Sequence, residues 1–306
     1  AFARLARLRF LVSDAIGKPV LRRDRLNFGY DNRFQNPTIC SRRLPSSIAP
    51  QTPYIRKPSM AKGNYIEAEE IIRRLEGGIT RPFLCRASNG KHYVAKGLEL
   101  PLAERIAELL CARLAADFGL PIPEHGYIYI DPALLRYNPE ARSDLGPGDS
   151  FALAYIADAT DLLYSQVLHV PVDLQKAVFT FDYWVGNGDR QLGPLGGRPN
   201  LLMCSTDNQL HLIDHNQAFH WPQEAEEFAG SHVFGPSNRA WHLDMVDKVE
   251  YSQRMYDTAK RFRDLCSDIP DEWCESIGKQ RLDILLKKIE SNLMRCNLNN
   301  FWSVLQ

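Results

Sequence analysis

The sequence predicts an α+β protein with two lobes, the first rich in strands and the second mainly helical. Two observations support this prediction. Short strand patterns gather around an Asn-Gly turn in the first half of the organised chain, and long helical patterns dominate the second half. Proteins in which strands come first and helices follow are typically α+β, because the two kinds of element then segregate in space.

Length and composition are those of an ordinary globular protein. The chain has 306 residues, of which 44% are hydrophobic and 24% are charged. No segment approaches the ~20 apolar residues that a bilayer span requires. The seven cysteines are odd in number and form no C-x-x-C pair. We therefore expect reduced thiols in a cytoplasmic protein rather than a disulfide framework or a zinc site.

The charge is distributed unevenly along the chain. Residues 1–59 carry twelve Lys or Arg, three Asp and no Glu, although the whole chain has a net charge of zero. We expect residues 1–63 to be disordered or an upstream extension, because this segment has weak periodicity and Met60 resembles a natural start. A transit-like leader is the alternative. The remaining part is mildly acidic, which argues against direct binding of nucleic acid.

The first predicted strands lie on both sides of a turn. Residues 82–87 and 91–97 flank Asn89-Gly90, a dipeptide that accepts positive φ, and therefore predict a β-hairpin. Residues 66–75 form a short element before this hairpin. Glu76, Gly77 and Gly78 between them are a turn signal.

One amphipathic helix follows the hairpin. Residues 102–118 are predicted to form it, because apolar residues recur every four positions and give one apolar stripe. Gly119 favours the end of this helix. Strands are expected over residues 127–130 and 150–156, with a polar loop over 131–149 between them.

The second half is mainly helical by its pattern. We expect a buried helix, a short hairpin, a long loop and two amphipathic helices. The buried helix is predicted over residues 172–185 and the hairpin over 200–204 and 210–213. The long loop is predicted over 219–240, and the two amphipathic helices over 241–266 and 271–293.

Four polar residues stand out at the ends of these elements. Lys96 ends a strand and Asp189 lies in a loop after a helix, whereas Asn200 begins a strand and Asp214 ends the next one. Each residue alone is more often a solvated charge or a turn residue. Asp214 is more specific, because an Asp directly after the apolar strand in LHLIDHN seldom serves only as a cap.

This set of groups fits phosphoryl transfer from ATP. A lysine neutralises phosphate oxygens, an Asp and an Asn bind Mg²⁺ through hard oxygen ligands, and a second Asp orients the attacking hydroxyl and accepts its proton. Strand lysine, loop Asp, strand Asn and hairpin Asp occur in this order in protein kinases.

Four segments carry a resemblance to a known family. They are GGITRPFLCRASNGKHYVAKG, ELLCARLAADFGLPIP, FDYWVGNGDR with RPNLL, and LHLIDHNQAF. From about residue 66 to residue 302 the chain resembles the HipA-like kinase family, and most of all its compact branch. The resemblance implies a bilobal protein-kinase-like fold over residues 64–306, with an N-lobe of about 64–156 and a C-lobe of about 157–306.

The resemblance also implies roles in the N-lobe. Lys96 is expected to bind phosphate, with Glu108 on the helix as its ion-pair partner. Glu104 lies one turn before Glu108 on the same helical face, so spacing alone leaves both as candidates. The loop over the phosphates is expected to contain Gly77, Gly78 and Thr80.

In the C-lobe, the resemblance implies Asp189 as catalytic base and Asn200 and Asp214 as magnesium ligands. Asn200 follows Asp189 by eleven positions, against five in the kinase motif, so QLGPLGGRP is an insertion in this loop. Its glycines and prolines suggest that the chain still returns to Asn200. Arg190 is expected either to orient the base or contact phosphate, or to form a structural salt bridge.

The expected function is an ATP- and Mg²⁺-dependent phosphotransferase, and by resemblance a kinase for Ser or Thr of an unknown protein substrate. Three alternatives stay open. The acceptor is a small-molecule or lipid hydroxyl, the chain is a pseudokinase that binds nucleotide without turnover, or it is a toxin with an antitoxin-like partner.

Overall fold

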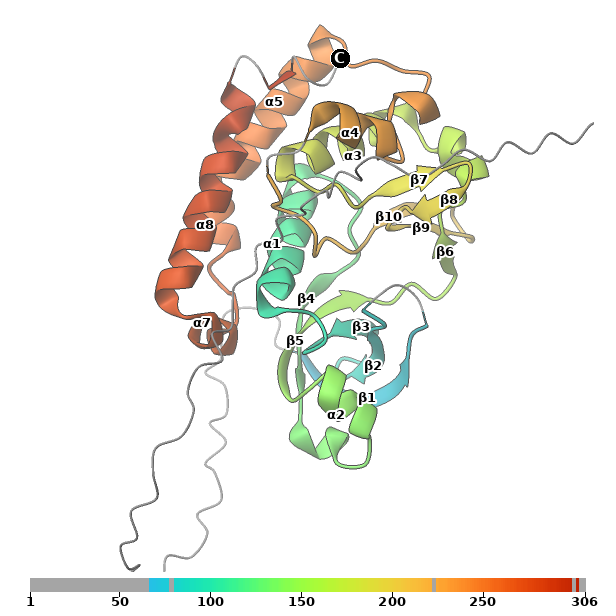
Figure 1. The fold of residues 1–306 in the computed structure, drawn as a ribbon. Coiled ribbons are helices and arrows are strands. Elements are labelled where there is room, and N and C mark those ends of the chain that lie inside the picture. The colour runs from blue at the N-terminus through green and yellow to red at the C-terminus, as the bar shows by residue number, and fades with distance from the viewer. Residues whose placement is uncertain (1–65, 77–79, 222–223, 299–300, 303–306) are drawn as a thin grey trace, which may run out of the picture. The chain divides into compact units, whose positions relative to one another are not determined.

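The structure is a computed structural model that describes residues 66–76, 80–221, 224–298 and 301–302 (Figure 1). The chain divides into two units, Ala1–Arg56 and Lys57–Gln306, and all described residues belong to the second. The strand-rich part forms a closed barrel in the order β1-β2-β3-β5-β4. Its strands are β1 (Ile66–Arg74), β2 (Phe83–Ala87), β3 (His92–Lys96), β4 (His125–Ile130) and β5 (Gly148–Ala154).

The predicted hairpin supplies two neighbouring strands of the barrel. β2 and β3 pair antiparallel across the turn at Asn89 and Gly90, and Gly90 adopts a φ of 77°. β3 pairs with β5, β5 with β4, and β4 closes the barrel by a parallel pairing with β1. A small core fills the barrel with alanine, isoleucine and aromatic side chains, among them Phe83, Tyr93 and Ile128.

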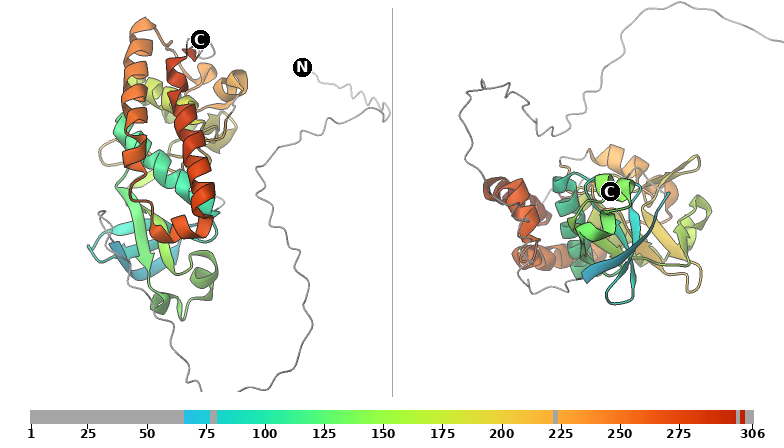
Figure 2. Two further views of the ribbon diagram at one scale, coloured as in Figure 1. Left: turned by 90° about the vertical axis from the view of Figure 1, so that its left-hand side faces the viewer. Right: turned by 90° about the horizontal axis from the view of Figure 1, so that it is seen from below.

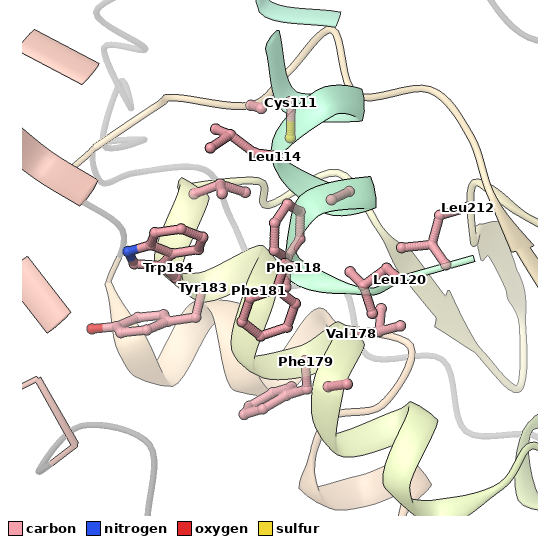
Figure 3. Packing of buried hydrophobic residues seen from close by; sticks show 14 of the residues in the cluster. Cys111, Leu114, Phe118, Leu120, Val178, Phe179, Phe181, Tyr183, Trp184 and Leu212 are labelled. Carbon is pink, nitrogen blue, oxygen red and sulfur yellow. The ribbon is translucent and has the colours of Figure 1, made fainter. Parts of the chain in front are cut away.

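Helix α1 (Leu102–Phe118) has the predicted bounds and connects β3 to β4. It ends at Gly119, whose φ of 91° lies in the left-handed region that glycine adopts without strain. Its apolar stripe packs on α3 (Val172–Val185), and Figure 3 shows side chains of the two helices meeting in the main core. The ring of Phe118 lies 5.3 Å from that of Phe181 and 6.0 Å from that of Trp184.

The part after the barrel contains short strands and most of the helices. One small sheet has the order β10-β9-β6, and β7 pairs with β8 in a separate hairpin. The strands are β6 (Ala159–Asp161), β7 (Gln191–Gly193), β8 (Gly196–Arg198), β9 (Leu201–Cys204) and β10 (Leu210–Leu212). The helices after α3 are α4 (Ala225–Ser231), α5 (Met245–Lys260), α6 (Phe262–Leu265), α7 (Asp271–Ile277) and α8 (Lys279–Leu293).

Helices α5 and α8 lie side by side (Figure 2) and join the main core. Trp184 of α3 is fully buried, and its Nε1–H donates to the carbonyl of Leu293 at 2.7 Å. The end of α8 is therefore tied to the helix that precedes the Asp189 loop.

Several predicted boundaries are wrong. The polar loop over 131–149 contains a 3-10 turn (Pro132–Leu135) and α2 (Pro139–Asp144), and the loop over 219–240 contains α4 and a 3-10 turn (Pro236–Asn238). These elements are too short for periodicity to predict, and burial of single residues such as Phe228 stabilises them. The helix over 271–293 is two helices, because Gly278 interrupts it at φ 84° and ψ 134°.

The cysteines within the described ranges, which exclude Cys40, are all free thiols. None of the helices described in the structure is both long and apolar enough to cross a bilayer.

Candidate active site

Lys96 lies at the end of β3 between two carboxylates. Its Nζ is 2.9 Å from Oε2 of Glu108 and 2.7 Å from Oδ1 of Asp214. Lys96 is only 6% exposed, so the interpretation of a strand-end lysine as a solvated charge is wrong here. One ammonium group thus connects the barrel, helix α1 and the segment after β10.

Glu108, and not Glu104, is the carboxylate of α1 that reaches Lys96. Glu108 is 1% exposed, and its Oε1 accepts the backbone N–H of His215 at 2.9 Å. Glu104 accepts instead from the side-chain amides of Asn216 and Gln217, at 2.9 and 3.0 Å. Both carboxylates of the helix therefore hold the segment directly after Asp214.

Burial and charge act against each other in this cluster. Burial by itself lowers the pKa of Lys96, but the Asp214 and Glu108 carboxylates outweigh it and raise the pKa above its ordinary value. Burial raises the pKa of Glu108 to about 7, although Lys96 opposes this. For Asp214 the balance is reversed, because Lys96 outweighs burial and lowers its pKa. Lys96 is therefore a permanent cation at neutral pH.

Asp189 and Asn200 meet although the insertion separates them. The Nδ2 of Asn200 donates to Oδ2 of Asp189 at 3.2 Å and to its backbone carbonyl at 3.3 Å. The inserted residues form the β7–β8 hairpin, whose antiparallel pairing returns the chain to its starting point. Burial raises the pKa of Asp189, while the hydrogen bond from Asn200 opposes this effect.

Asn200 and Asp214 lie just outside the strands in which they were predicted. Asn200 precedes β9 and Asp214 follows β10 by two residues, with φ values of 48° and 56°. A left-handed φ is uncommon for residues other than glycine and is enriched at functional sites. The N–H of Ile213 donates to the carbonyl of Asn200 at 3.1 Å, so the two segments run next to each other.

The predicted phosphate loop is described only in part. Gly77 and Gly78 lie outside the described residues, so their predicted contact with phosphate stays a prediction. Thr80 is half-buried in the turn before β2. The loop is closed by the N–H of Leu75, which donates to the carbonyl of Pro82 at 2.7 Å.

A buried polar cluster lies next to the Asp189 loop, and the sequence analysis foresaw only one part of it, a structural salt bridge as one alternative for Arg190. Its centre is the ion pair of Asp182 and Arg190, both with 0% exposed side chains and 2.7 Å apart. Asn187 and His232 also donate to the Asp182 carboxylate, at 2.9 and 3.0 Å. Of the roles considered for Arg190, the buried position excludes direct phosphate contact. The sequence signal was Asp182 itself, a charge within the apolar helix segment VFTFDYWV.

The oxygen atoms of Asn200 and Asp214 fit the requirements of magnesium. The amide nitrogen of Asn200 is used in the bond to Asp189, and its amide oxygen remains as a ligand atom. Asp214 contacts Lys96 through Oδ1, and its side chain is 28% exposed, so its carboxylate remains accessible to a cation. Mg²⁺ is commonly bound by one or two protein oxygens of this kind, together with phosphate oxygens and water.

The chain belongs to the HipA-like kinase family, whose sequence model matches residues 68–305. This match confirms the resemblance that the four segments carry. It agrees with the observed α+β fold, in which a strand-rich N-terminal part precedes a helical C-terminal part. No curated protein sequence matches the chain.

Two solved structures show the extent of structural similarity. The proinflammatory kinase CtkA of Helicobacter pylori is 10% identical, with a TM-score of 0.46 over 73% of this chain and 89% of CtkA. A Golgi casein kinase with Mn/ADP bound is 12% identical, with a TM-score of 0.36 over 78% of this chain and 74% of that protein. These similarities are low, and membership of the family rests on the sequence match.

Proposed function

We propose that this protein is a magnesium-dependent kinase that transfers the γ-phosphoryl group of ATP to a hydroxyl group. The position of Lys96 between Glu108 and Asp214 carries the proposal, because it fixes a buried cation beside a candidate magnesium ligand. The hydrogen-bonded pair of Asp189 and Asn200 supplies a base and a second oxygen ligand. These are the groups that phosphoryl transfer requires.

Each residue has a separate task in this proposal. Lys96 neutralises phosphate oxygens, and Glu108 keeps its ammonium group in place. Asn200 and Asp214 hold the magnesium ion, which neutralises charge on the phosphates when it is bound. Asp189 orients the attacking hydroxyl and accepts its proton. The opposite pKa directions of Asp189 and Asp214 support this division, since a base benefits from a raised pKa and a metal ligand from a lowered one.

We further propose a serine or threonine of another protein as the acceptor, which membership of the HipA-like kinase family supports. Labelled ATP and Mg²⁺ test both statements together. The protein is incubated with γ-labelled ATP, alone and with a heat-inactivated cell extract, and labelled residues are identified after acid hydrolysis. We expect phosphoserine or phosphothreonine with the wild type and roughly 10²–10⁴-fold slower labelling with Asp189→Asn.

Each other outcome points to one of the alternatives. Label in a lipid or small-molecule fraction indicates a non-protein hydroxyl as acceptor. Magnesium-dependent nucleotide binding without any transfer indicates a pseudokinase. Purification of the tagged protein with a stoichiometric small partner that blocks transfer supports an antitoxin-like inhibitor, which nothing in the fold requires.

A further inference from the structure

The insertion between Asp189 and Asn200 raises a physical problem for the proposed site. Eleven positions separate two side chains that must lie within hydrogen-bond distance. A longer loop has more conformations to lose when its ends are brought together. Regular pairing in β7–β8 restricts the inside of the loop, but something must also hold its two ends.

Arg190 contacts both ends of the insertion. It is the residue directly after Asp189, and its Nη1 donates to the carbonyls of Pro199, at 3.3 Å, and of Asn200. Its own carbonyl accepts the N–H of Val233 at 2.9 Å. The residue before the inserted segment is therefore joined through one guanidinium group to the segment's last residue and to Asn200.

The same guanidinium reaches the segment of the second candidate magnesium ligand. Its Nη2 lies 3.4 Å from Nε2 of His215, the residue directly after Asp214. A guanidinium group has only donors, so Nε2 of His215 is the acceptor of this contact. The N–H of His215 in turn donates to Glu108, the partner of Lys96.

Asp182 of α3 sets the orientation of the guanidinium group of Arg190. The Nε of Arg190 donates to Oδ2 of Asp182 at 2.7 Å. Asn187 binds the other carboxylate oxygen, and His232 binds Oδ2. The Nδ1 of His232 accepts the N–H of Phe234 at 3.0 Å, so its Nε2 carries the proton. Burial lowers the pKa of His232, which leaves Arg190 and Asp182 as the two charges of the cluster.

We infer that Arg190 is a positioning residue that closes the insertion and sets the distance between Asp189, Asn200 and Asp214. This inference rests on the proposed function for its catalytic consequence. A guanidinium group suits the task, because its planar set of donors binds several acceptors in fixed directions, which an ammonium group cannot do. Asp182 fixes the orientation of the guanidinium plane, so that the plane faces both the Asn200 segment and the Asp214 segment.

The test uses the full chain and two variants. Removal of one partner from a buried ion pair commonly unfolds a protein, so the first variant, Asp182→Asn with Arg190→Met, removes both charges together. The second variant, Arg190→Lys, keeps the charge but not the planar donors. Arg113→Lys is the matched control, since Arg113 is a largely buried arginine that binds Asp268 at 2.7 Å and the carbonyl of Leu265 at 2.8 Å away from the site.

Folding is checked first by circular dichroism. Backbone hydrogen exchange over residues 187–201 is then compared with exchange in α8, and ADP affinity is measured with and without Mg²⁺. We expect faster exchange in this loop for both Arg190 variants and unchanged exchange in α8. The gain in ADP affinity from Mg²⁺ should shrink roughly 10- to 100-fold, as it does when groups that orient metal ligands are removed. Phosphoryl transfer should fall roughly 100-fold.

Two results would overturn the inference. One is a folded double variant in which hydrogen exchange in the loop and the gain in ADP affinity from Mg²⁺ both equal those of the wild type. The other is an Arg190→Lys variant that equals the Arg113→Lys control in every measurement. Absence of transfer in the wild type would contradict the proposed function alone, because loop exchange and Mg²⁺-dependent ADP affinity still decide whether Arg190 positions the ligands.

Discussion

At the scale of single residues, the site is a set of carboxylates held in place by two buried cations. Lys96 forms ion pairs with the carboxylates of Glu108 and Asp214, and Arg190 forms one with the carboxylate of Asp182. Burial makes each of these charges dependent on its partner, because an unpaired charge in the interior is costly. The residues that bind nucleotide in our proposal therefore also contribute to stability.

Replacement of Lys96 by Ala should lower the stability of the protein as well as its affinity for ATP. Glu108 stays buried and loses its ion-pair partner, and broken buried pairs cost about 3–5 kcal/mol. Chemical unfolding should show this loss, and Lys96→Ala combined with Glu108→Gln should recover part of it. Calorimetry should detect no Mg-ATP binding in either variant. An Ala variant with wild-type stability and wild-type affinity would contradict the assignment of Lys96.

Asp189 and Asp214 should fail in different ways when each is replaced by Asn. Asp214→Asn removes an anionic oxygen from both Lys96 and the proposed magnesium ion, so Mg-ATP affinity should fall together with turnover. Asp189→Asn should leave Mg-ATP affinity near the wild-type value and slow transfer by roughly 10²–10⁴-fold. Titration calorimetry and radiolabel transfer on both variants make the comparison. The opposite pattern of affinities would exchange the two roles.

Glu99 should make the stability of the protein depend on pH. Both of its carboxylate oxygens are buried, and burial raises its pKa from 4.5 to about 7, although the nearby backbone N–H groups of Glu99 and Gly97 oppose this effect. The folded state therefore binds the proton more tightly than the unfolded chain. This contribution to stability is complete below about pH 4.5 and is lost as the pH rises through about 7.

Glu99→Gln should remove this contribution to the pH dependence. Between pH 5 and pH 8, the thermal midpoint should fall less for the Gln variant than for the wild type. Burial raises the pKa of Asp149 to about 6. Asp149 therefore lowers the thermal midpoint of both proteins over the same pH range, and its effect cancels when they are compared. Equal slopes for the two proteins would show that Glu99 is ionised without cost.

At the scale of elements, the β7–β8 hairpin is the feature that separates this loop from the shorter kinase motif. It is held at its base by the bridge between Gln191 and His232 and by Asn238, whose Nδ2 donates to the carbonyl of Leu192 at 2.8 Å. Leu195 at the turn is fully exposed. The hairpin is thus fixed where it meets Asp189 and free at its tip.

Two glycines of this hairpin give a matched pair of variants. A Cβ at Gly197 would lie 2.4 Å from the carbonyl oxygen of Gln191 and 2.9 Å from the Cα of Leu192, whereas a Cβ at Gly193 meets nothing within 4 Å. Gly197→Ala should therefore separate the two strands and reduce phosphoryl transfer, and Gly193→Ala should change neither. Limited proteolysis of the hairpin and a transfer assay test this prediction. Equal proteolysis and equal transfer rates for the two variants would mean that the backbone of β7 accommodates the extra Cβ without affecting the site.

At the scale of the whole molecule, the described residues form one core in the barrel and a larger core that α1 shares with the later helices. α1 carries both Glu108, which faces Lys96, and Phe118, which packs on α3. Any shift of this helix changes the site and the main core together. We therefore expect nucleotide binding and stability to be coupled through α1.

A protein that begins at Met60 should fold with the thermal midpoint of the full chain. The family match starts at residue 68, and chain contacts divide at Arg56 and Lys57. The prediction that residues 1–63 are a separate extension has this consequence. Circular dichroism of the two proteins compares their thermal midpoints. A midpoint lower by many degrees, or loss of soluble expression, would show that the segment packs on the rest of the protein.

The sequence by itself determined the elements whose signal is local. An Asn-Gly turn, a stripe of apolar residues and a glycine stop specify the β2–β3 hairpin and α1 through short-range geometry. The sequence also indicated which four polar residues to expect together, because phosphoryl transfer limits their types and their order along the chain. Lys96 and Asp214 are indeed in contact, as are Asp189 and Asn200.

Only the tertiary structure decided the remaining features. It chose Glu108 over Glu104, since both lie on one helical face and their distance to Lys96 depends on how α1 packs against the barrel. It also determined that Lys96 is buried, and that Asp182 contacts both Arg190, eight residues later, and His232, which is fifty residues later. The physical reason is that the energy of a charge depends on its burial and its partners, and both are set by contacts between distant segments, which periodicity and spacing do not encode.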